Sequence, residues 1–125
     1  MSEENNPVNW FEIPVDDLER AMKFYETVFG IELSLNQMGP LKMAWFPMFP
    51  GGGGAAGSLA QAEGYTPSHA GTLVYFSVED INATLELIDK NGGKTLLPKN
   101  SIGEYGFIAR FEDCEGNRVG LHARD

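Results

Sequence analysis

Apolar and polar positions follow the same succession twice along the chain. Residues 8 to 15 alternate between apolar and polar side chains, as a strand with one buried face does. From Asp16 the apolar positions recur every three or four residues, Glu19 completes a capping box, and Gly30 supplies a helix stop. The succession returns in the second half, where the helix stop is residues 91 to 93. Each half is therefore predicted to begin with a strand and an amphipathic helix.

Three short strand-like runs follow each predicted helix. They cover residues 31 to 37, 41 to 49 and 55 to 61 in the first half, and residues 94 to 100, 105 to 112 and 117 to 123 in the second. Glycine, proline and asparagine separate the runs and supply the turns. The predicted fold class is α+β, built from two βαβββ modules. We expect one domain over residues 1–125, with module one at about 7–61, a joint at 62–71 and module two at about 72–123.

The two modules also match residue by residue. A constant offset of 63 positions (93 − 30 and 120 − 57) aligns Gly30 with Gly93 and Gly57 with Gly120, and no gap is needed. Such regularity indicates an internal duplication, and two copies that cannot bury their faces alone pack against each other. Matching residues then converge near a pseudo-twofold axis. We expect the functional site where the two copies meet.

Composition and charge narrow the classes of function. The 125 residues are 42% hydrophobic, which is enough for one core. The net charge of −9, without any Lys/Arg cluster, argues against nucleic acid as a partner. No apolar run of leader or membrane length occurs, so a soluble cytoplasmic protein is expected. Cys114, the only cysteine, lies between Asp113 and Glu115, whose charges are expected to raise the pKa of the thiol and reduce its reactivity.

Three segments carry a family resemblance. They are residues 11–18 (FEIPVDDL), 24–30 (FYETVFG) and 113–121 (DCEGNRVGL). In these segments and in its module order, the chain resembles the vicinal oxygen chelate superfamily, which includes glyoxalase I, bleomycin resistance proteins and extradiol dioxygenases. The resemblance implies curved sheets around a shared cleft, helices outside and, as in many members, a homodimer. It does not fix a function, because members range from enzymes to ligand-sequestering proteins.

The resemblance also implies where a metal would bind. Metal-dependent members place ligands on the first and last strands of each module, and the matching positions here are Trp10, Gly57, Leu73 and Gly120. None of these side chains can coordinate a hard or borderline divalent ion. We therefore expect no cofactor and disfavour a divalent metal.

Strand alternation places a polar set beside these positions. The set comprises Glu12, Tyr75, Arg118 and His122, each two residues from a matching position on its strand. Glu12 and His122 could transfer protons, with Tyr75 as a hydrogen-bond donor, because burial raises the pKa of a carboxyl toward the working range. The same pair could bind one displaced ion. In the alternative interpretation, Glu12 is paired with Arg118 or capped by backbone N–H groups, and His122 is a half-exposed residue of the last strand.

Apolar residues indicate what the cleft could hold. The candidates for its lining are Trp10, Trp45, Leu73, Tyr75 and Phe107. Gly57 and Gly120 would leave open volume among them, and an organic ligand suits such a pocket. Trp10 and Trp45 fit equally well as core residues, because an aromatic lining and an aromatic filling look alike in sequence. Three phenylalanines on the opposite alternation are expected in the core: Phe46, Phe76 and Phe111.

Three functions follow from these patterns. The first is a protein of the glyoxalase/bleomycin-resistance type that binds a small organic ligand in its cleft without the usual metal ligands. The second is a lyase or isomerase, related to lactoylglutathione lyase, that uses Glu12 and His122 directly or with a displaced metal. The third is an inert dimeric interaction module. The sequence leaves open whether the two modules pair within one chain or swap across a dimer.

Overall fold

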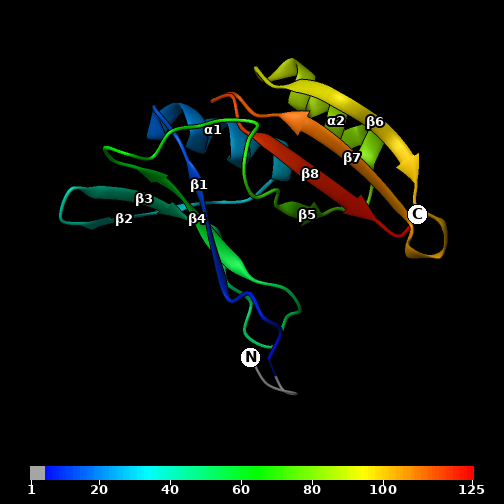
Figure 1. Ribbon diagram of the computed structural model, residues 1–125, viewed down its shortest axis with the longest axis horizontal. Helices are drawn as coiled ribbons and strands as arrows, with labels where there is room; N and C mark the ends of the chain where they lie inside the picture. The colour runs from blue at the N-terminus through cyan, green and yellow to red at the C-terminus, as the bar shows by residue number, and fades with distance from the viewer. Residues whose placement is uncertain (1–4) are drawn as a thin grey trace.

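The computed structural model describes residues 5–125 of the chain (Figure 1). In these residues two four-stranded sheets and two α-helices confirm the predicted α+β fold of two βαβββ modules. The first module contains β1 (Trp10–Pro14), α1 (Leu18–Phe29), β2 (Ser34–Met38), β3 (Leu41–Trp45) and β4 (Ala56–Gln61). The second contains β5 (Tyr75–Ser77), α2 (Ile81–Lys90), β6 (Lys94–Ser101), a short 3-10 helix (Gly103–Tyr105), β7 (Phe107–Glu112) and β8 (Arg118–Ala123).

The two sheets share one topology, with strand orders β1-β4-β3-β2 and β5-β8-β7-β6. The pairs β1/β4 and β5/β8 are parallel, and the other pairs are antiparallel. In Figure 1 helix α1 lies above the first sheet and helix α2 lies behind β6 and β7, while β1 and β4 run downward toward the N-terminus and away from β8. The molecule is therefore an arch, with the helices on its convex side and a concave face beneath.

Helix α1 begins one residue later than the capping-box pattern predicted. Its N-cap is Asp17, whose side chain accepts a hydrogen bond from the Arg20 N–H at 3.1 Å. The predicted cap, Asp16, instead donates its backbone N–H to Glu115 at 2.8 Å, so this residue belongs to a tertiary contact. The helix ends at Gly30, as predicted. There φ is +63°, a left-handed conformation that glycine adopts without steric strain. Neither helix of the described chain is long and apolar enough to cross a membrane.

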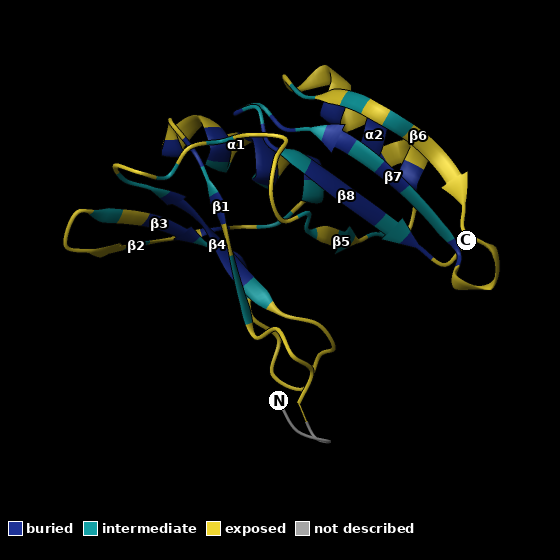
Figure 2. Ribbon diagram, viewed as in Figure 1, coloured by how far each residue is buried: buried dark blue, intermediate teal, exposed yellow. Residues whose placement is uncertain are grey.

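The core lies between the helices and the helix-facing sides of the sheets (Figure 2). Phe46 and Phe111 are buried there, and Phe76 packs its ring against Phe29 with the centroids 4.9 Å apart. Tyr25 lies among them, 5.6 Å from the Phe46 ring. The three phenylalanines expected in the core are therefore found in it, and the opposite alternation faces the concave side.

A buried polar turn, residues 113–117, ties the second module to the first. Asp113 is 1% exposed and accepts a hydrogen bond from the Tyr25 hydroxyl at 2.7 Å. Asn117 donates its side-chain amide to the Pro14 carbonyl, also at 2.7 Å. Burial raises the pKa of Asp113, and burial together with the Asp113 charge raises the pKa of Tyr25 well above its ordinary value. These contacts join the two modules within a single chain.

Glu115 completes the polar turn. Its carboxylate accepts hydrogen bonds from the backbone N–H groups of Asp16 and Asp17, both at 2.8 Å, and from Arg20 Nε at 2.6 Å. Burial alone would raise the pKa of Glu115, but these donors and the Arg20 charge hold it below its ordinary value. Burial and then the Glu115 and Asp113 charges raise the pKa of Cys114 to about 12. The predicted direction for this thiol is confirmed.

Candidate functional site

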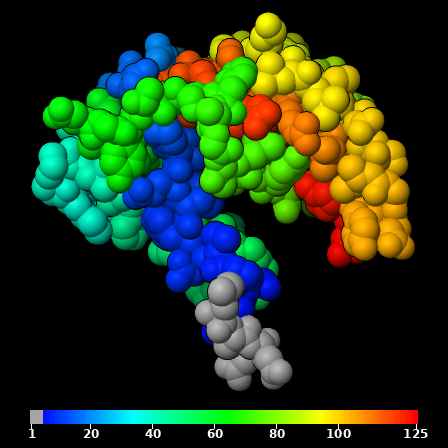
Figure 3. Space-filling model, in the orientation of Figure 1, coloured from blue at the N-terminus to red at the C-terminus, as the bar shows by residue number. Residues whose placement is uncertain are grey.

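An open cavity of about 1440 Å³ lies between the two modules, and its wall extends from the concave face to the neighbouring residues of α1 and α2. Residues from both modules line it, among them Trp10, Glu12, Leu73, Tyr75 and Arg118. Figure 3 shows a hollow on this face between the N-terminal strand, in blue, and the C-terminal strands, in orange and red. Five of the residues predicted to meet in a cleft are therefore parts of one cavity wall.

The first sheet presents an aromatic pair on its concave face. Trp10 and Trp45 contact each other edge to face, with ring centroids 5.3 Å apart and planes at 76°. In the strand register Ser58 lies opposite both Glu12 and Trp45, so these side chains share the face. Ser58 Oγ and Trp45 Nε1 are buried, and neither has a hydrogen-bond partner among residues 5–125. This face therefore combines indole surface with polar atoms that lack partners.

Glu12 is exposed, and its partner differs from the one considered from the sequence. Its Oε1 accepts a hydrogen bond from the Tyr65 hydroxyl at 3.1 Å. That bond and the carboxylate charge raise the pKa of Tyr65. Arg118 forms no ion pair with Glu12, so the pairing suggested in the alternative interpretation does not occur in the described chain. Tyr65 lies in the joint between the modules, where no strand alternation could have identified it.

The second sheet presents a tyrosine and arginine pair on its concave face. Tyr75 and Arg110 both lie opposite Gly120 in the register, and Arg110 Nε donates to the Tyr75 hydroxyl at 3.0 Å. A β-carbon added at Gly120 would overlap the Tyr75 ring. The open volume predicted at Gly120 is therefore wrong, because Tyr75 already covers this position.

Gly57 does not lie on the concave face. Glu12 pairs with Ser58, whereas its repeat partner Tyr75 pairs with Gly120, so the offset changes from 63 to 62 (75 − 12 and 120 − 58). The prediction of a gapless repeat is therefore wrong in β4, and a slip of one residue moves a side chain to the other face. Gly57 faces the helices instead, and a β-carbon there would overlap the Phe11 ring. The prediction of open cleft volume at Gly57 is also wrong.

Phe107 likewise lies on the helix-facing side, so its predicted place in the cleft lining is wrong. It alternates in phase with Ala109 and Phe111, both 0% exposed, and packs against the core. Lys99 Nζ lies 4.5 Å from the centroid of its ring. The sequence carried a signal for this phase, because Phe107 lies four residues before Phe111, which was expected in the core.

His122 and Glu12 have separate partners on the two sheets. His122 Nε2 lies 2.7 Å from the Tyr105 carbonyl oxygen, and the residue is of intermediate exposure in β8. No hydrogen bond joins it to Glu12 within the described chain. The structure thus places both residues on strands of the arch without bringing them together.

The residues at the expected ligand positions do not fit a metal ion. With Ser58 replacing Gly57 as the structural match, these positions hold Trp10, Ser58, Leu73 and Gly120. They offer one hydroxyl, which is a poor ligand by itself, and no imidazole, thiolate or carboxylate. Across residues 5–125 no group of three or more His, Cys, Asp or Glu side chains could hold an ion.

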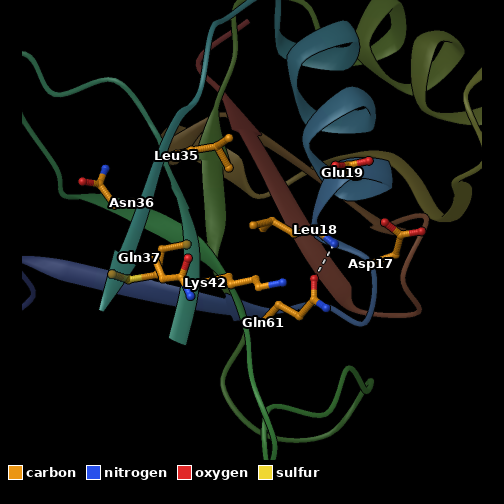
Figure 4. Close-up of a pocket in the computed structure, with 9 residues that line it drawn as sticks. Asp17, Leu18, Glu19, Leu35, Asn36, Gln37, Lys42 and Gln61 are labelled. Atoms are coloured by element: carbon orange, nitrogen blue, oxygen red, sulfur yellow. Dashed lines mark hydrogen bonds between the residues drawn. The ribbon is translucent and has the colours of Figure 1, made fainter. Parts of the chain in front are cut away.

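A second, smaller groove of about 500 Å³ lies between the first turn of α1 and the β2–β3 hairpin (Figure 4). Its lining is mostly polar and consists of Asp17, Leu18, Glu19, Leu35, Asn36, Gln37, Lys42, Met43 and Gln61. The Gln61 side chain closes one end, because its Oε1 accepts a hydrogen bond from the Leu18 N–H at 2.8 Å. This groove is separate from the cavity between the modules and shares no lining residue with it.

Comparisons with known proteins agree with this geometry. A glyoxylase-like domain-containing protein from Didymella fabae is 33% identical over 123 residues, covering 94% of this chain and 93% of that protein. An antibiotic binding protein from a Streptomyces species has a similar structure, with a TM-score of 0.71, 24% identity and coverage of 99% of this chain and 100% of that one. A glyoxalase I mutant from Zea mays gives a TM-score of 0.70 at 24% identity.

The maize match covers 94% of this chain but 47% of that protein, so this chain spans about half of the maize enzyme's length. The family model of the Glyoxalase/Bleomycin resistance protein/Dioxygenase superfamily matches residues 8–121, which include both helices and both sheets except for the last two residues of β8. The chain therefore belongs to the glyoxalase/bleomycin resistance protein/dioxygenase superfamily, as its three motif segments predicted.

Proposed function

We propose that this protein binds a small organic ligand in the cavity between its modules without a metal of the family type. The observation that supports this proposal most directly is the cavity of about 1440 Å³, whose wall is built from both modules. This open cavity exceeds the ~300–1000 Å³ that small-molecule sites commonly occupy, so such a ligand would fill part of it, and these sites combine apolar surface with a few polar groups. The wall meets that description, because Trp10 and Leu73 supply apolar surface while Glu12 and Arg118 supply charge.

The side chains at the expected ligand positions support the same proposal. An indole, a hydroxyl, an isobutyl group and a glycine replace donors that would hold a divalent ion. The Tyr75 ring also occupies the space into which a side chain at position 120 would project. A family-type metal centre would therefore need changes at four positions and a displaced tyrosine.

A lyase or isomerase is the alternative, and the glyoxylase-like name of the Didymella fabae relative favours it. This activity would need Glu12 and His122 to act on one ligand, although each has its own partner on a different sheet. Glu12 lines the cavity and is the better placed of the two. Turnover that is abolished by both Glu12→Gln and His122→Ala would establish this alternative.

We further propose that the protein is a cytoplasmic homodimer. The cavity is open along one side of the single chain, and a second copy could close it. The third possibility, an inert interaction module, agrees poorly with a cavity of this size between the sheets.

Native mass spectrometry of the purified protein tests these proposals together. The protein is measured before and after incubation with excess nickel, zinc, manganese and ferrous iron. We expect a dimer that retains no ion, and in favourable preparations an additional organic mass. One tightly held ion per chain, lost in Glu12→Gln or His122→Ala, would overturn the proposal and favour the enzyme.

A further inference from the structure

Two arginines lie next to each other on the concave face of the second sheet. Arg110 in β7 pairs with Gly120 in β8, and Arg118 lies two residues before Gly120 on the same strand. Side chains at these positions point to the same face, and such diagonal neighbours are about 7–8 Å apart. The two positive charges repel each other, and an anion bound between them would offset that repulsion.

Neither arginine has an acidic partner. Arg110 uses Nε to donate to the neutral hydroxyl of Tyr75. Arg118 Nε is buried and has no hydrogen-bond partner among residues 5–125. The two ion pairs of the described chain are Arg20 with Glu115 and His69 with Glu112.

The acidic side chain opposite Arg118 already has a partner. Glu112 lies directly opposite Arg118 in the register, but its Oε1 is 2.8 Å from His69 Nε2. The guanidinium groups therefore keep N–H donors available. Tyr75 and Arg118 line the cavity, and the Tyr75 hydroxyl holds Arg110 beside them.

We propose that Arg110 and Arg118 form an oxyanion site, so that the ligand of the cavity carries a carboxylate or a group of similar geometry. A guanidinium group presents its donors as a planar fork that matches the two oxygens of a carboxylate. The apolar part of the same ligand contacts the wall that contains Trp10. This inference rests on the proposed ligand-binding function and adds the chemical class of the ligand, an organic acid with an apolar body.

The test compares two probes of the same shape, 2-naphthoate and 2-naphthamide, of which only the first is charged. Each is titrated into the full-length ¹⁵N-labelled protein. The indole N–H signals report on the first sheet, because Trp10 and Trp45 are the only two tryptophans of the chain. The Nε–H signals of Arg110 and Arg118 report on the second sheet. We expect naphthoate to bind at least about tenfold more tightly than naphthamide, since hydrogen bonds to charged groups are the stronger ones.

Arginine variants test whether the preference for 2-naphthoate over 2-naphthamide arises at the proposed oxyanion site. Arg110→Gln and Arg118→Gln are each expected to bring the two affinities together. Arg124→Gln removes an exposed arginine outside the cavity and is expected to retain the preference. An equal loss in Arg124→Gln would attribute the preference to overall charge and overturn the site.

Titration of the unmodified protein also tests the oxyanion site, and this test does not depend on whether a variant folds. Equal affinity for the two probes would overturn the oxyanion site and leave the ligand-binding function intact. If neither probe moves the indole signals, a titration with inorganic sulfate decides between the proposals. Sulfate that shifts the Arg110 and Arg118 signals would support the anion site while the ligand-binding function fails. No shift with sulfate would overturn the anion site as well.

Discussion

The two modules use the same connection in opposite ways. In the second module the polar turn at residues 113–117 joins β7 to β8 and buries the side chains of Asp113, Glu115 and Asn117. In the first module residues 46–55 join β3 to β4, with four consecutive glycines and with residues 48–55 all exposed. One copy of the connection therefore holds the modules together and contributes only Asn117 to the cavity wall, while the other contributes several residues to that wall.

The two modules also differ in the contacts made at the start of their helices. The N–H groups of Asp16 and Asp17 before α1 both donate to Glu115 in the polar turn. The start of α2 has the N-cap bond from the Ala83 N–H to Asp80 at 3.1 Å, and both of these residues line the cavity. A duplicated fold needs only one copy of such a contact to fix its modules. The other copy can then change without loss of the arch.

The largest effect is expected from Asp113→Ala in the polar turn. The change leaves the buried Tyr25 hydroxyl and the N–H groups of Glu115 and Asn117 without their acceptor. Because unsatisfied buried groups cost ~1–3 kcal/mol each, we expect a loss of about 3 kcal/mol in the free energy of unfolding. Urea unfolding measures it.

The matched control lies in the glycine-rich connection. A β-carbon at Gly53 meets no atom within 4 Å, so Gly53→Ala is expected to change stability by no more than about 0.5 kcal/mol. Similar losses in the two variants would contradict the division of roles between the connections.

The second prediction concerns the glycines that the gapless alignment had paired. In Gly57→Ala the new methyl group would overlap both the ring and the backbone oxygen of Phe11, so something in the β1–β4 pair must move. In Gly120→Ala the three atoms nearest to the new methyl group all belong to the ring of Tyr75, which is 40% exposed and can turn away. We expect a loss of about 2–3 kcal/mol for Gly57→Ala and about 1 kcal/mol for Gly120→Ala. Thermal unfolding of both variants measures these losses in stability. Equal losses would contradict the one-residue slip in β4.

The third prediction uses pH to separate the polar turn from the rest of the chain. The pKa of Glu115 is lowered in the folded protein, so its contribution to stability is complete above the unfolded-state value of about 4.3 and disappears as pH falls through the folded value. The pKa of Asp113 is raised, so its effect has the opposite sign and partly cancels this trend. Glu115→Gln is therefore expected to be less stable than the parent near neutral pH.

That difference is expected to shrink as pH falls from about 4.3 through the lowered pKa of folded Glu115, because below that pKa both proteins carry a neutral side chain at position 115. Urea unfolding at a series of pH values gives the two curves. Parallel curves across this range would show that the charge of Glu115 does not stabilise the turn.

The sequence predicted the modules well because periodicity and helix stops are local signals. Gly30 ends α1 because the backbone at the helix end is left-handed, a conformation that favours glycine. A single glycine in the sequence is therefore enough to predict this helix end. The N-cap at Asp17 was missed by one position because Glu115, far away in the sequence, takes the Asp16 N–H. Local patterns therefore predicted the helices and strands. Which of two adjacent aspartates caps α1 depends on a tertiary contact that these patterns do not contain.

The site was harder to predict because it depends on which face each strand presents. A constant offset placed Gly57 on the concave face, and a slip of one residue in β4 puts Ser58 there instead. Arg110 was missed, although its alternation with the core residue Phe111 on the same strand was a usable signal. Tyr65 had no signal, because its contact with Glu12 depends on the path of the joint.

The smallest expected effect tests how the second sheet prepares its proposed anion site. Tyr75→Phe keeps the ring over Gly120 and removes only the hydroxyl that accepts from Arg110 Nε at 3.0 Å. Since one such hydrogen bond contributes ~0.5–1.5 kcal/mol, the affinity for 2-naphthoate is expected to fall about threefold. The affinity for 2-naphthamide is expected to stay the same, because the ring that contacts a neutral ligand is still present. Calorimetric titration of both probes separates these outcomes, and an equal loss for the two would make Tyr75 part of the general wall rather than a positioning residue for Arg110.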